Sequence, residues 1–187
     1  MNTLFPDQFL PEGFSYQADF LTSTEEEQLL EEIEKIELHP MIFQGFEAKR
    51  KVSSYGYDWS FDKRVLTKGK EIPQAFDFLI QNIAKGFKIQ KGAFAELLIT
   101  EYPGGSVINW HRDAPPFDVI VGVSLLADCT FKLRPYDKAK QKRGAVISFP
   151  VKQRSLYVMK GAVRTEWEHS IAPVEKLRYS ITLRTLR

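Results

Sequence analysis

The sequence predicts an α+β protein whose core is a β-sandwich or jelly roll. Two segments with helical periodicity come first, and six short segments with strand character follow them. Turn residues such as Pro103-Gly104-Gly105 separate the later segments. Helices followed by a run of short strands are typical of this class. Because 187 residues suffice for one well-buried core and are few for two, we expect a single domain over residues 1–187.

The first helix is predicted to begin at Ser23, three residues before Glu26, which is the spacing of a capping box. Pro40 is expected to end this helix, so His39 is interpreted as a residue near a helix end. The apolar spacing indicates one buried face. The residues of that face are Leu29, Ile33 and Ile36.

A second helix is predicted from Pro73, because proline suits the first position of a helix, and Gly86 marks its end. Its apolar residues also follow one helical face. They are Phe76, Leu79, Ile80, Ile83 and Phe87.

The strand segments fill the second half of the chain. The segment 119–126 is almost continuously apolar, whereas 178–184 alternates between polar and apolar residues. The six segments are 95–102, 119–126, 131–134, 145–149, 155–159 and 178–184.

Composition limits the classes of protein. The net charge is only +2, so any nucleic-acid footprint must be local. Cys129 is the only cysteine, which excludes an intrachain disulfide and a thiolate metal cluster. Residues 1–21 lack the pattern of a signal peptide, and no apolar run approaches the ~20 residues of a membrane span. We therefore expect a soluble, cytoplasmic protein that is a monomer.

Two histidines and an aspartate form the most informative pattern. His111 and Asp113 are two residues apart, so in an extended segment their side chains point to the same side. With His169 they make the two-imidazole, one-carboxylate set that holds non-haem Fe(II) and leaves positions for O2 and a co-substrate. The alternative is that His169 is a core histidine and Asp113 a turn residue.

Two arginines on the last strand segment favour the metal site. Arg178 and Arg184 are six residues apart and share a face with Ser180 and Thr182. A guanidinium grips a carboxylate with two hydrogen bonds, which suits a dicarboxylate such as 2-oxoglutarate. A solvated edge strand is the alternative. The pattern as a whole indicates an Fe(II)/2-oxoglutarate oxygenase.

These residues resemble the AlkB family of Fe(II)/2-oxoglutarate dioxygenases. The resemblance rests on Tyr102, on the H-R-D sequence 111–113, on His169 and on the R-Y-x-x-T-x-R pattern of 178–184. It implies a double-stranded β-helix, with residues 1–92 as a helical and lid extension and 93–187 as the jelly-roll core.

The resemblance also implies roles for individual residues. His111, Asp113 and His169 would hold Fe(II), and no further catalytic side chain is implied. Tyr102 and Arg178 would bind 2-oxoglutarate, and Arg184 would lie near its metal-chelating end. Two more residues of this co-substrate pocket, Thr100 and Ser180, stand where the family commonly has asparagine.

The implied reaction is oxidative demethylation of N-alkylated bases in DNA or RNA, with release of succinate and CO2. DNA-repair members carry an acidic residue shortly after H-x-D, and here 114–116 is Ala-Pro-Pro. This departure leaves the chemistry in place but makes RNA a serious possibility. Two alternatives are the same chemistry on a protein side chain and a catalytically idle nucleic-acid-binding module.

Two basic segments are candidates for contacting a nucleic acid. The first, 49–59, is predicted to be a lid over the substrate, although a hairpin whose aromatic side chains cover the core would have the same pattern. The second, 132–143, has six basic residues and one acidic residue and could be a rim for nucleic acid or a solvated hairpin. The predicted substrate-binding residues are Arg50, Tyr55, Tyr57 and Trp59.

Overall fold

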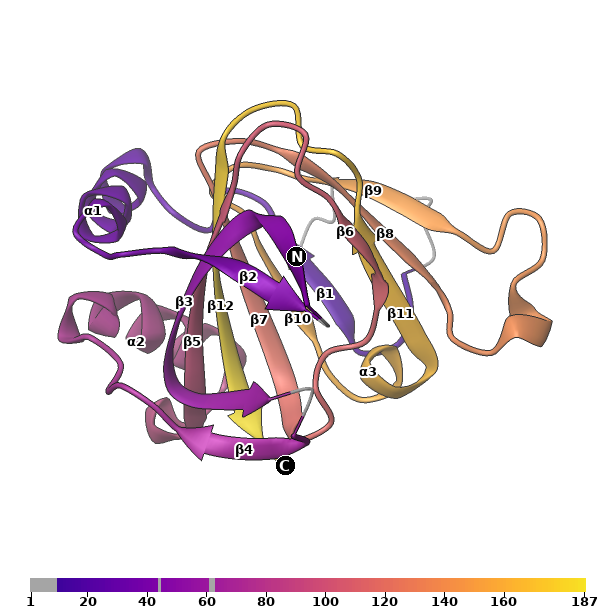
Figure 1. Ribbon diagram of the computed structural model, residues 1–187, viewed down its shortest axis with the longest axis horizontal. Coiled ribbons are helices and arrows are strands. Elements are labelled where there is room, and N and C mark those ends of the chain that lie inside the picture. Colours follow the sequence, from indigo (N-terminus) through magenta and orange to yellow (C-terminus); the bar gives the residue numbers. More distant parts are fainter. Residues whose placement is uncertain (1–9, 44, 61–62) are drawn as a thin grey trace.

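Two antiparallel sheets packed face to face form the protein in the computed structural model, with two helices on the outer face of the larger sheet (Figure 1). The structure describes residues 10–43, 45–60 and 63–187. Residues 1–9 lie outside the described residues. They are part of the segment 1–21, which lacks the sequence pattern of a signal peptide. The double-stranded β-helix and the α+β class expected from the sequence are confirmed by this architecture and by the structural neighbours given below.

The larger sheet has eight strands in the order β1-β10-β7-β12-β5-β3-β2, and β4 pairs with β3. The smaller sheet has the order β6-β11-β8-β9. The strands of the larger sheet are β1 (Phe14–Gln17), β2 (His39–Phe43), β3 (Phe46–Ser60), β4 (Val65–Lys68), β5 (Phe94–Tyr102), β7 (Phe117–Leu125), β10 (Leu156–Met159) and β12 (Arg178–Leu186). Those of the smaller sheet are β6 (Ile108–His111), β8 (Cys129–Pro135), β9 (Ile147–Val151) and β11 (Trp167–Ile171).

The first helix, α1 (Ser23–Glu34), begins where the sequence indicated, but its cap differs by one residue. Thr22 is the N-cap, and it forms the capping box with Glu25. The prediction that Pro40 ends this helix was wrong, because α1 stops at Glu34. Pro40 lies in β2, at the edge of the larger sheet, where its missing N–H interrupts no pairing on the outer side. His39 is the first residue of that strand.

The second helix, α2 (Asp77–Phe87), follows a short 3-10 turn, η1 (Gln74–Phe76). Pro73 caps that turn instead of starting the α-helix. Gly86 lies inside α2, and the left-handed conformation that ends it is at Lys88, with φ of 55°. Two further 3-10 turns, η2 (Lys91–Ala93) and η3 (Lys138–Lys140), and a short helix, α3 (Ala162–Glu166), complete the elements.

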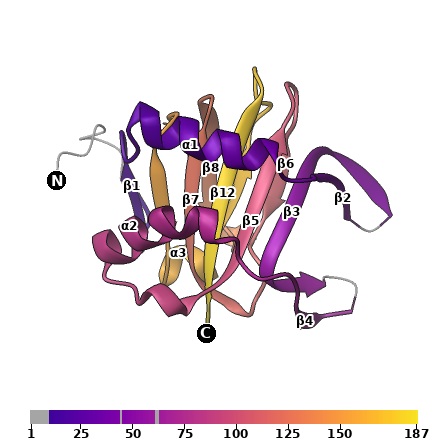
Figure 2. The same ribbon diagram turned by 90° about the vertical axis from the view of Figure 1, so that its left-hand side faces the viewer.

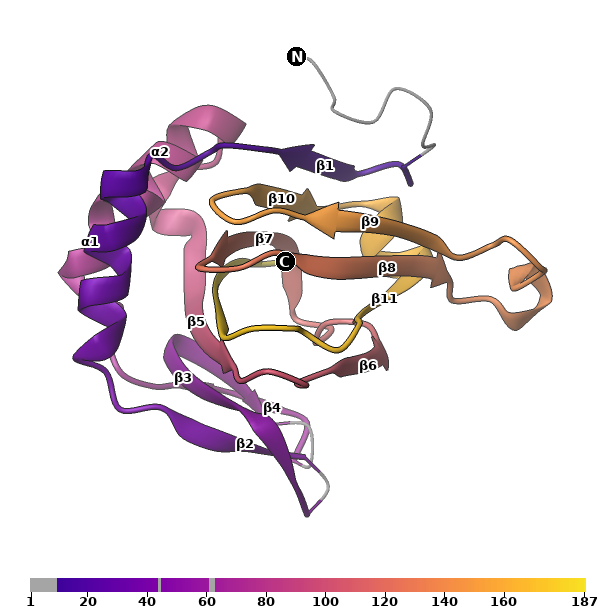
Figure 3. The ribbon, with the colours of Figure 1, turned by 90° about the horizontal axis from the view of Figure 1, so that it is seen from above.

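Two hydrophobic cores result from this layering. Both helices cover one face of the larger sheet (Figure 2), and their apolar faces pack on it. The second core lies between the two sheets (Figure 3). Strand β7 is central in the larger sheet, so both of its faces are covered. This explains its continuous apolar sequence.

The N-terminal half also contributes strands to the larger sheet. Strand β3 extends the sheet beside β5, and β1 extends it beside β10 on the other side. Among the described residues, no helix is long and apolar enough to cross a membrane.

Candidate metal and co-substrate site

The three predicted metal ligands come together on the inner side of the smaller sheet. His111 ends β6 and lies directly opposite His169 in β11, and Asp113 follows two residues later. One potential ligand atom from each of the three lies within 4.8 Å of the others. The Nε2 atom of His169 is 3.7 Å from Oδ2 of Asp113. This donor set and spacing can hold one metal ion.

Each histidine ring is held from behind. Nδ1 of His111 lies 2.9 Å from the carbonyl oxygen of Asn109, and because a carbonyl only accepts, this nitrogen carries the proton. The bond therefore leaves Nε2 of His111 with its lone pair, as metal ligation requires. The ring of His169 stacks on that of Phe131, with centroids 5.3 Å apart and planes 8° from parallel.

The two carboxylate oxygens of Asp113 differ in their hydrogen bonding. Its Oδ1 accepts a hydrogen bond of 3.1 Å from Nη2 of Arg184. Its Oδ2 is buried and has no hydrogen-bond partner. A buried carboxylate oxygen without a donor is costly, and a cation at the position between the two histidines would satisfy it.

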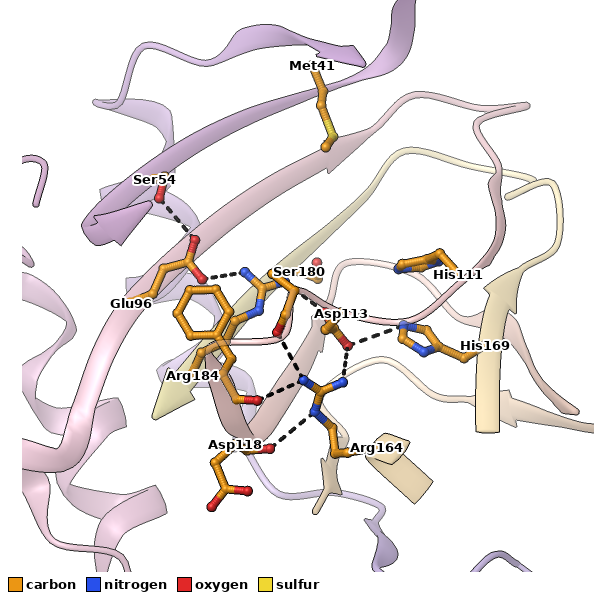
Figure 4. Close-up of polar contacts among 12 residues, drawn as sticks. Met41, Ser54, Glu96, His111, Asp113, Asp118, Arg164, His169, Ser180 and Arg184 are labelled. Atoms are coloured by element: carbon orange, nitrogen blue, oxygen red, sulfur yellow. Dashed lines mark hydrogen bonds and ion pairs between the residues drawn. The ribbon is translucent and has the colours of Figure 1, made fainter. Parts of the chain in front are cut away.

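Arg184 is fixed from its other side by Glu96, a buried residue of β5. Nη1 of Arg184 donates to Oε2 of Glu96 over 2.5 Å, and Ser54 donates to the remaining oxygen. Figure 4 shows this row of side chains running from Ser54 through Glu96 and Arg184 to Asp113. Two of the three guanidinium nitrogens of Arg184 are thus committed to carboxylates. Glu96 was not singled out by the sequence, although period-2 spacing places it on the same face as Tyr102.

Arg164 of α3 is the second residue that the sequence did not indicate. Its side chain is almost fully buried and donates to the carbonyl oxygens of Phe117 (2.9 Å), Asp118 (3.1 Å) and Ala114 (3.4 Å). Its Nη1 also lies 3.7 Å from Oδ2 of Asp113. In Figure 4 the guanidinium stands between the metal-ligand candidates and the segment that follows them. Arg164 therefore holds residues 114–118 in place behind Asp113.

The electrostatics give His169 and Asp113 the protonation states that a metal needs. Burial and the neighbouring ring of His111 lower the pKa of His169 to about 3, so its imidazole is neutral at physiological pH. Burial alone would raise the pKa of Asp113, but the imidazoles and the guanidiniums of Arg184 and Arg164 hold it well below its usual range. A neutral imidazole at His169 and a carboxylate at Asp113 result.

Arg178 is the most deeply buried cation among the described residues. Its side chain is 1% exposed, yet within the described ranges no carboxylate forms an ion pair with it. Nε donates to Oγ of Ser124 over 2.9 Å, and Nη1 has no partner. The guanidinium lies over the ring of Tyr102, 4.9 Å from its centroid. A buried guanidinium without a counter-charge fits the carboxylate of a bound ligand.

The other predicted co-substrate residues surround this group. Tyr102 pairs directly with Arg178 across β5 and β12, and Thr100 pairs with Ser180 one step further. The Ser180 hydroxyl lies 3.5 Å from that of Tyr102. All four side chains are buried on the inner face, which is the face that the alternation of 178–184 predicted.

The predicted substrate residues on β3 are not brought together. Arg50 is half-buried, lies 2.8 Å from the sulfur of Met41, and has a lowered pKa because of its burial. Trp59 packs on the core between the sheets, whereas Tyr55 packs on the helix side, away from the metal ligands. Tyr57 lines a shallow surface groove with Lys68. Gly56, with φ of 84°, interrupts the strand alternation between these residues.

Comparison with known proteins agrees with the geometry of the site. The chain matches the family model of the 2OG-Fe(II) oxygenase superfamily over residues 13–184. The tRNA (carboxymethyluridine(34)-5-O)-methyltransferase alkbh8 of Xenopus tropicalis is 29% identical over 171 residues, which are 88% of this chain and 26% of that protein. The Alkylated DNA repair protein ALKBH8 homolog of Arabidopsis thaliana is 26% identical over 198 residues, which are 94% of this chain and 56% of that protein. The chain therefore spans about a quarter to about half of the length of these relatives.

Two solved structures share the fold at low sequence identity. The structure of OsALKBH1 aligns with a TM-score of 0.73 and 14% identity, covering 95% of this chain and 99% of that one. A prolyl hydroxylase from Trichoplax adhaerens, in complex with a peptide fragment of hypoxia inducible factor, aligns with a TM-score of 0.65 and 17% identity. That alignment covers 93% of this chain and 83% of the hydroxylase.

Proposed function

Because the chain belongs to the 2OG-Fe(II) oxygenase superfamily and resembles its AlkB-like members, we propose that it removes N-alkyl groups from nucleic-acid bases by oxidation. Enzymes of this superfamily use Fe(II), 2-oxoglutarate and O2. The observation that carries the proposal is the similarity, over 88% and 94% of this chain, to relatives whose names refer to tRNA and to alkylated DNA.

In this proposal Fe(II) is held by His111, Asp113 and His169. The bound metal supplies the activation of O2 that couples decarboxylation of 2-oxoglutarate to hydroxylation of the substrate. The protein keeps the ligands ready for it. The carbonyl of Asn109 fixes the tautomer of His111, and Arg184 holds Oδ1 of Asp113 so that Oδ2 faces the two imidazoles.

Arg178 and Tyr102 are proposed to receive 2-oxoglutarate. The buried guanidinium can neutralise the carboxylate far from the metal, and the tyrosine hydroxyl can donate to the same group. Ser124 holds Nε of Arg178, which orients the free Nη1. Arg184 remains a positioning residue here, because two of its nitrogens already bind Glu96 and Asp113.

Hydroxylation of an N-methyl carbon gives a carbinolamine, which releases formaldehyde and leaves the unmethylated base. The segment after Asp113 has no acidic side chain at 114–116, and Arg164 binds its backbone carbonyls. A carboxylate that reads the base from that position is therefore missing. Both RNA and DNA remain within the proposed substrate class.

The test is succinate release in the presence of Fe(II), 2-oxoglutarate and a panel of N-methylated DNA, RNA and peptides. We expect a methylated oligonucleotide to stimulate succinate release above its unmethylated counterpart, with formaldehyde formed in equal amount. Stimulation by methylated peptides alone would instead assign the chemistry to a protein side chain and contradict the proposal.

Two variants tie the activity to the site. His111→Ala should abolish succinate release because it removes a proposed metal ligand. Arg178→Ala should raise the KM for 2-oxoglutarate roughly 30-fold or more, since truncating one partner of a buried charge pair costs about 2–5 kcal/mol. The matched control is Arg187→Ala at the exposed C-terminus, which should leave that KM unchanged.

A further inference from the structure

We propose that the outer face of the smaller sheet, together with the β8–β9 hairpin, binds the phosphate backbone of single-stranded nucleic acid. We call this the basic face and define it by the residues Trp110, Arg112, Lys132, Arg134, Tyr136, Lys138, Lys140, Lys142 and Arg143. The inference deepens the proposed function and rests on it for the choice of partner.

Alternation along the strands separates the basic face from the active site. In β8, Phe131 and Leu133 point into the core between the sheets, so Lys132 and Arg134 point outward. The β8–β9 hairpin carries the remaining cations and extends beyond the sheet (Figure 1). The lysines at 138, 140 and 142 and Arg143 are all exposed.

Positive charge is concentrated at this place. Residues 132–143 hold six of the 26 basic residues of the chain and one of its 24 acidic residues, so 20 basic and 23 acidic residues are left elsewhere. Lys138, Lys140, Lys142 and Arg143 form no ion pair with any carboxylate of the described residues. A hairpin that only faces solvent does not require this excess of positive charge. Because these cations have no carboxylate partner, they are available to the phosphates of a polyanion.

Two aromatic rings lie among these cations, and a guanidinium lies over each ring. The guanidinium of Arg134 lies over the ring of Trp110, 4.2 Å from its centroid, and Glu168 fixes the same guanidinium from the other side. The guanidinium of Arg112 lies over the ring of Tyr136 at 3.5 Å. Tyr136 is 49% exposed. An exposed and a half-buried ring with guanidinium planes beside them are surfaces on which unpaired bases stack, which favours a single strand over a duplex.

The basic face also begins beside the proposed metal site. Trp110 and Arg112 flank His111 in the chain: Trp110 lies in β6 under the guanidinium of Arg134, and Arg112 follows the strand and lies over Tyr136. Strand β6 is the edge strand of its sheet. A nucleic-acid chain held on the basic face would thus reach, at this edge, the strand that carries the first metal-ligand candidate.

The test measures binding of a fluorescein-labelled, unmodified 15-nucleotide RNA to the full chain as a function of salt concentration. The variant Lys138→Gln/Lys140→Gln/Lys142→Gln removes three charges from the basic face. Each phosphate contact contributes roughly 0.7 to the slope of log K against log salt for a single strand, so the slope should shrink by about 2. The Kd at low salt should rise roughly 10- to 100-fold.

The matched control removes three exposed lysines elsewhere, as Lys85→Gln/Lys88→Gln/Lys160→Gln. An unchanged Kd in the hairpin variant, or an equal loss in the control variant, would overturn the basic face. So would binding of the wild-type chain to vesicles with 30% phosphatidylserine that is as tight as its binding to RNA.

The design keeps this inference separate from the proposed function. Succinate release without nucleic acid should be equal in the wild-type chain and in the hairpin variant, since the variant residues lie outside the metal site. If methylated oligonucleotides stimulate turnover but the hairpin variant has the same Kd as the wild type, only the basic face is wrong. If RNA binds through the hairpin but no nucleic acid stimulates turnover, only the proposed reaction is wrong.

Discussion

The sharpest structural prediction concerns Arg164, which we expect to be essential for the stability of the segment after Asp113. The variant Arg164→Met keeps an unbranched side chain of similar volume but removes the guanidinium. Three backbone carbonyl oxygens, at distances of 2.9, 3.1 and 3.4 Å, then lose their donor. The carboxylate of Asp113 loses the cation at 3.7 Å.

The expected loss is about 3–5 kcal/mol in the free energy of unfolding. Hydrogen bonds from a charged donor contribute about 1.5–3 kcal/mol each, but burial of the guanidinium, which lowers the pKa of Arg164, offsets part of their sum. Removing one partner of a buried ion pair costs a similar 3–5 kcal/mol. For a chain of this length, the loss corresponds to a Tm lower by about 6–20 °C.

Urea unfolding of the metal-free protein measures this loss directly. Arg164→Lys keeps the charge but not the fork, and we expect it to lie between the wild type and Arg164→Met. The exposed Arg143→Met should stay within about 0.5 kcal/mol of the wild type. A second readout is the affinity for Co(II), followed by its d–d absorption, which should fall about tenfold or more in Arg164→Met. A loss of less than 1 kcal/mol with unchanged Co(II) affinity would refute the role assigned to this residue.

Three further predictions concern the scaffold. Glu26→Ala removes a buried carboxylate that accepts hydrogen bonds from one backbone N–H and two side chains, and it should cost about 2–4 kcal/mol in urea unfolding, whereas the exposed Glu27→Ala should cost under 0.5 kcal/mol. Gly122→Ala would place a methyl group inside the buried ring of Tyr157, so thermal unfolding should show a loss of about 1–3 kcal/mol. Partial burial raises the pKa of Asp128. The hydrogen bonds from Lys152 and from a backbone N–H lower the pKa by a larger amount, so it falls below the ordinary value of 3.8. Its contribution is therefore present above that pH and lost as the pH falls through the folded-state pKa, so the stability difference between the wild type and Asp128→Ala, under about 1 kcal/mol, should shrink as the pH is lowered below 3.8.

Much of the strand framework could be predicted because the relevant signal is local. The continuous apolar sequence of 119–126 reflects a strand covered on both faces, and the alternation of 178–184 reflects one polar and one apolar face. The N-cap was misplaced by one residue because Thr22 and Ser23 both carry a hydroxyl that can cap a helix. Only the tertiary position of α1 decides between them.

The edge strands could not be predicted for a different reason. Strand β1 is four residues long and pairs with β10, far away in the sequence. Its stability comes from that pairing, and an alternation of apolar and polar residues over only four positions is too short to predict the strand. Pro40 gave a misleading signal, because proline is compatible both with the end of a helix and with an edge strand.

The candidate site likewise contains residues that the sequence predicted and residues that it did not. His111, Asp113 and His169 were found because rare residue types stood at an informative spacing. The supporting residues were not found, since what matters in them is a partner distant in sequence. Arg164 binds backbone carbonyls, which have no residue type to recognise. Glu96 had a usable signal, its shared parity with Tyr102, but its partner is 88 residues away.

The charge balance of the candidate metal and co-substrate site leads to one last prediction. Three largely buried guanidiniums, those of Arg164, Arg178 and Arg184, face two carboxylates, those of Glu96 and Asp113. A divalent metal adds to this positive excess, and the 2-oxoglutarate dianion removes what the metal adds. Each should therefore improve the binding of the other, by linkage.

Titration of 2-oxoglutarate into the chain under anaerobic conditions, with and without Co(II), measures the coupling. We expect the metal to strengthen 2-oxoglutarate binding at least tenfold. Arg178→Met removes one buried cation. Its affinity for 2-oxoglutarate without metal should therefore be lower than that of the wild-type chain, while the metal should still strengthen 2-oxoglutarate binding. Equal 2-oxoglutarate affinity with and without metal in the wild-type chain would mean that the charges of the metal and of 2-oxoglutarate do not compensate each other at this site. In that case Arg178 would bind its anion independently of the triad.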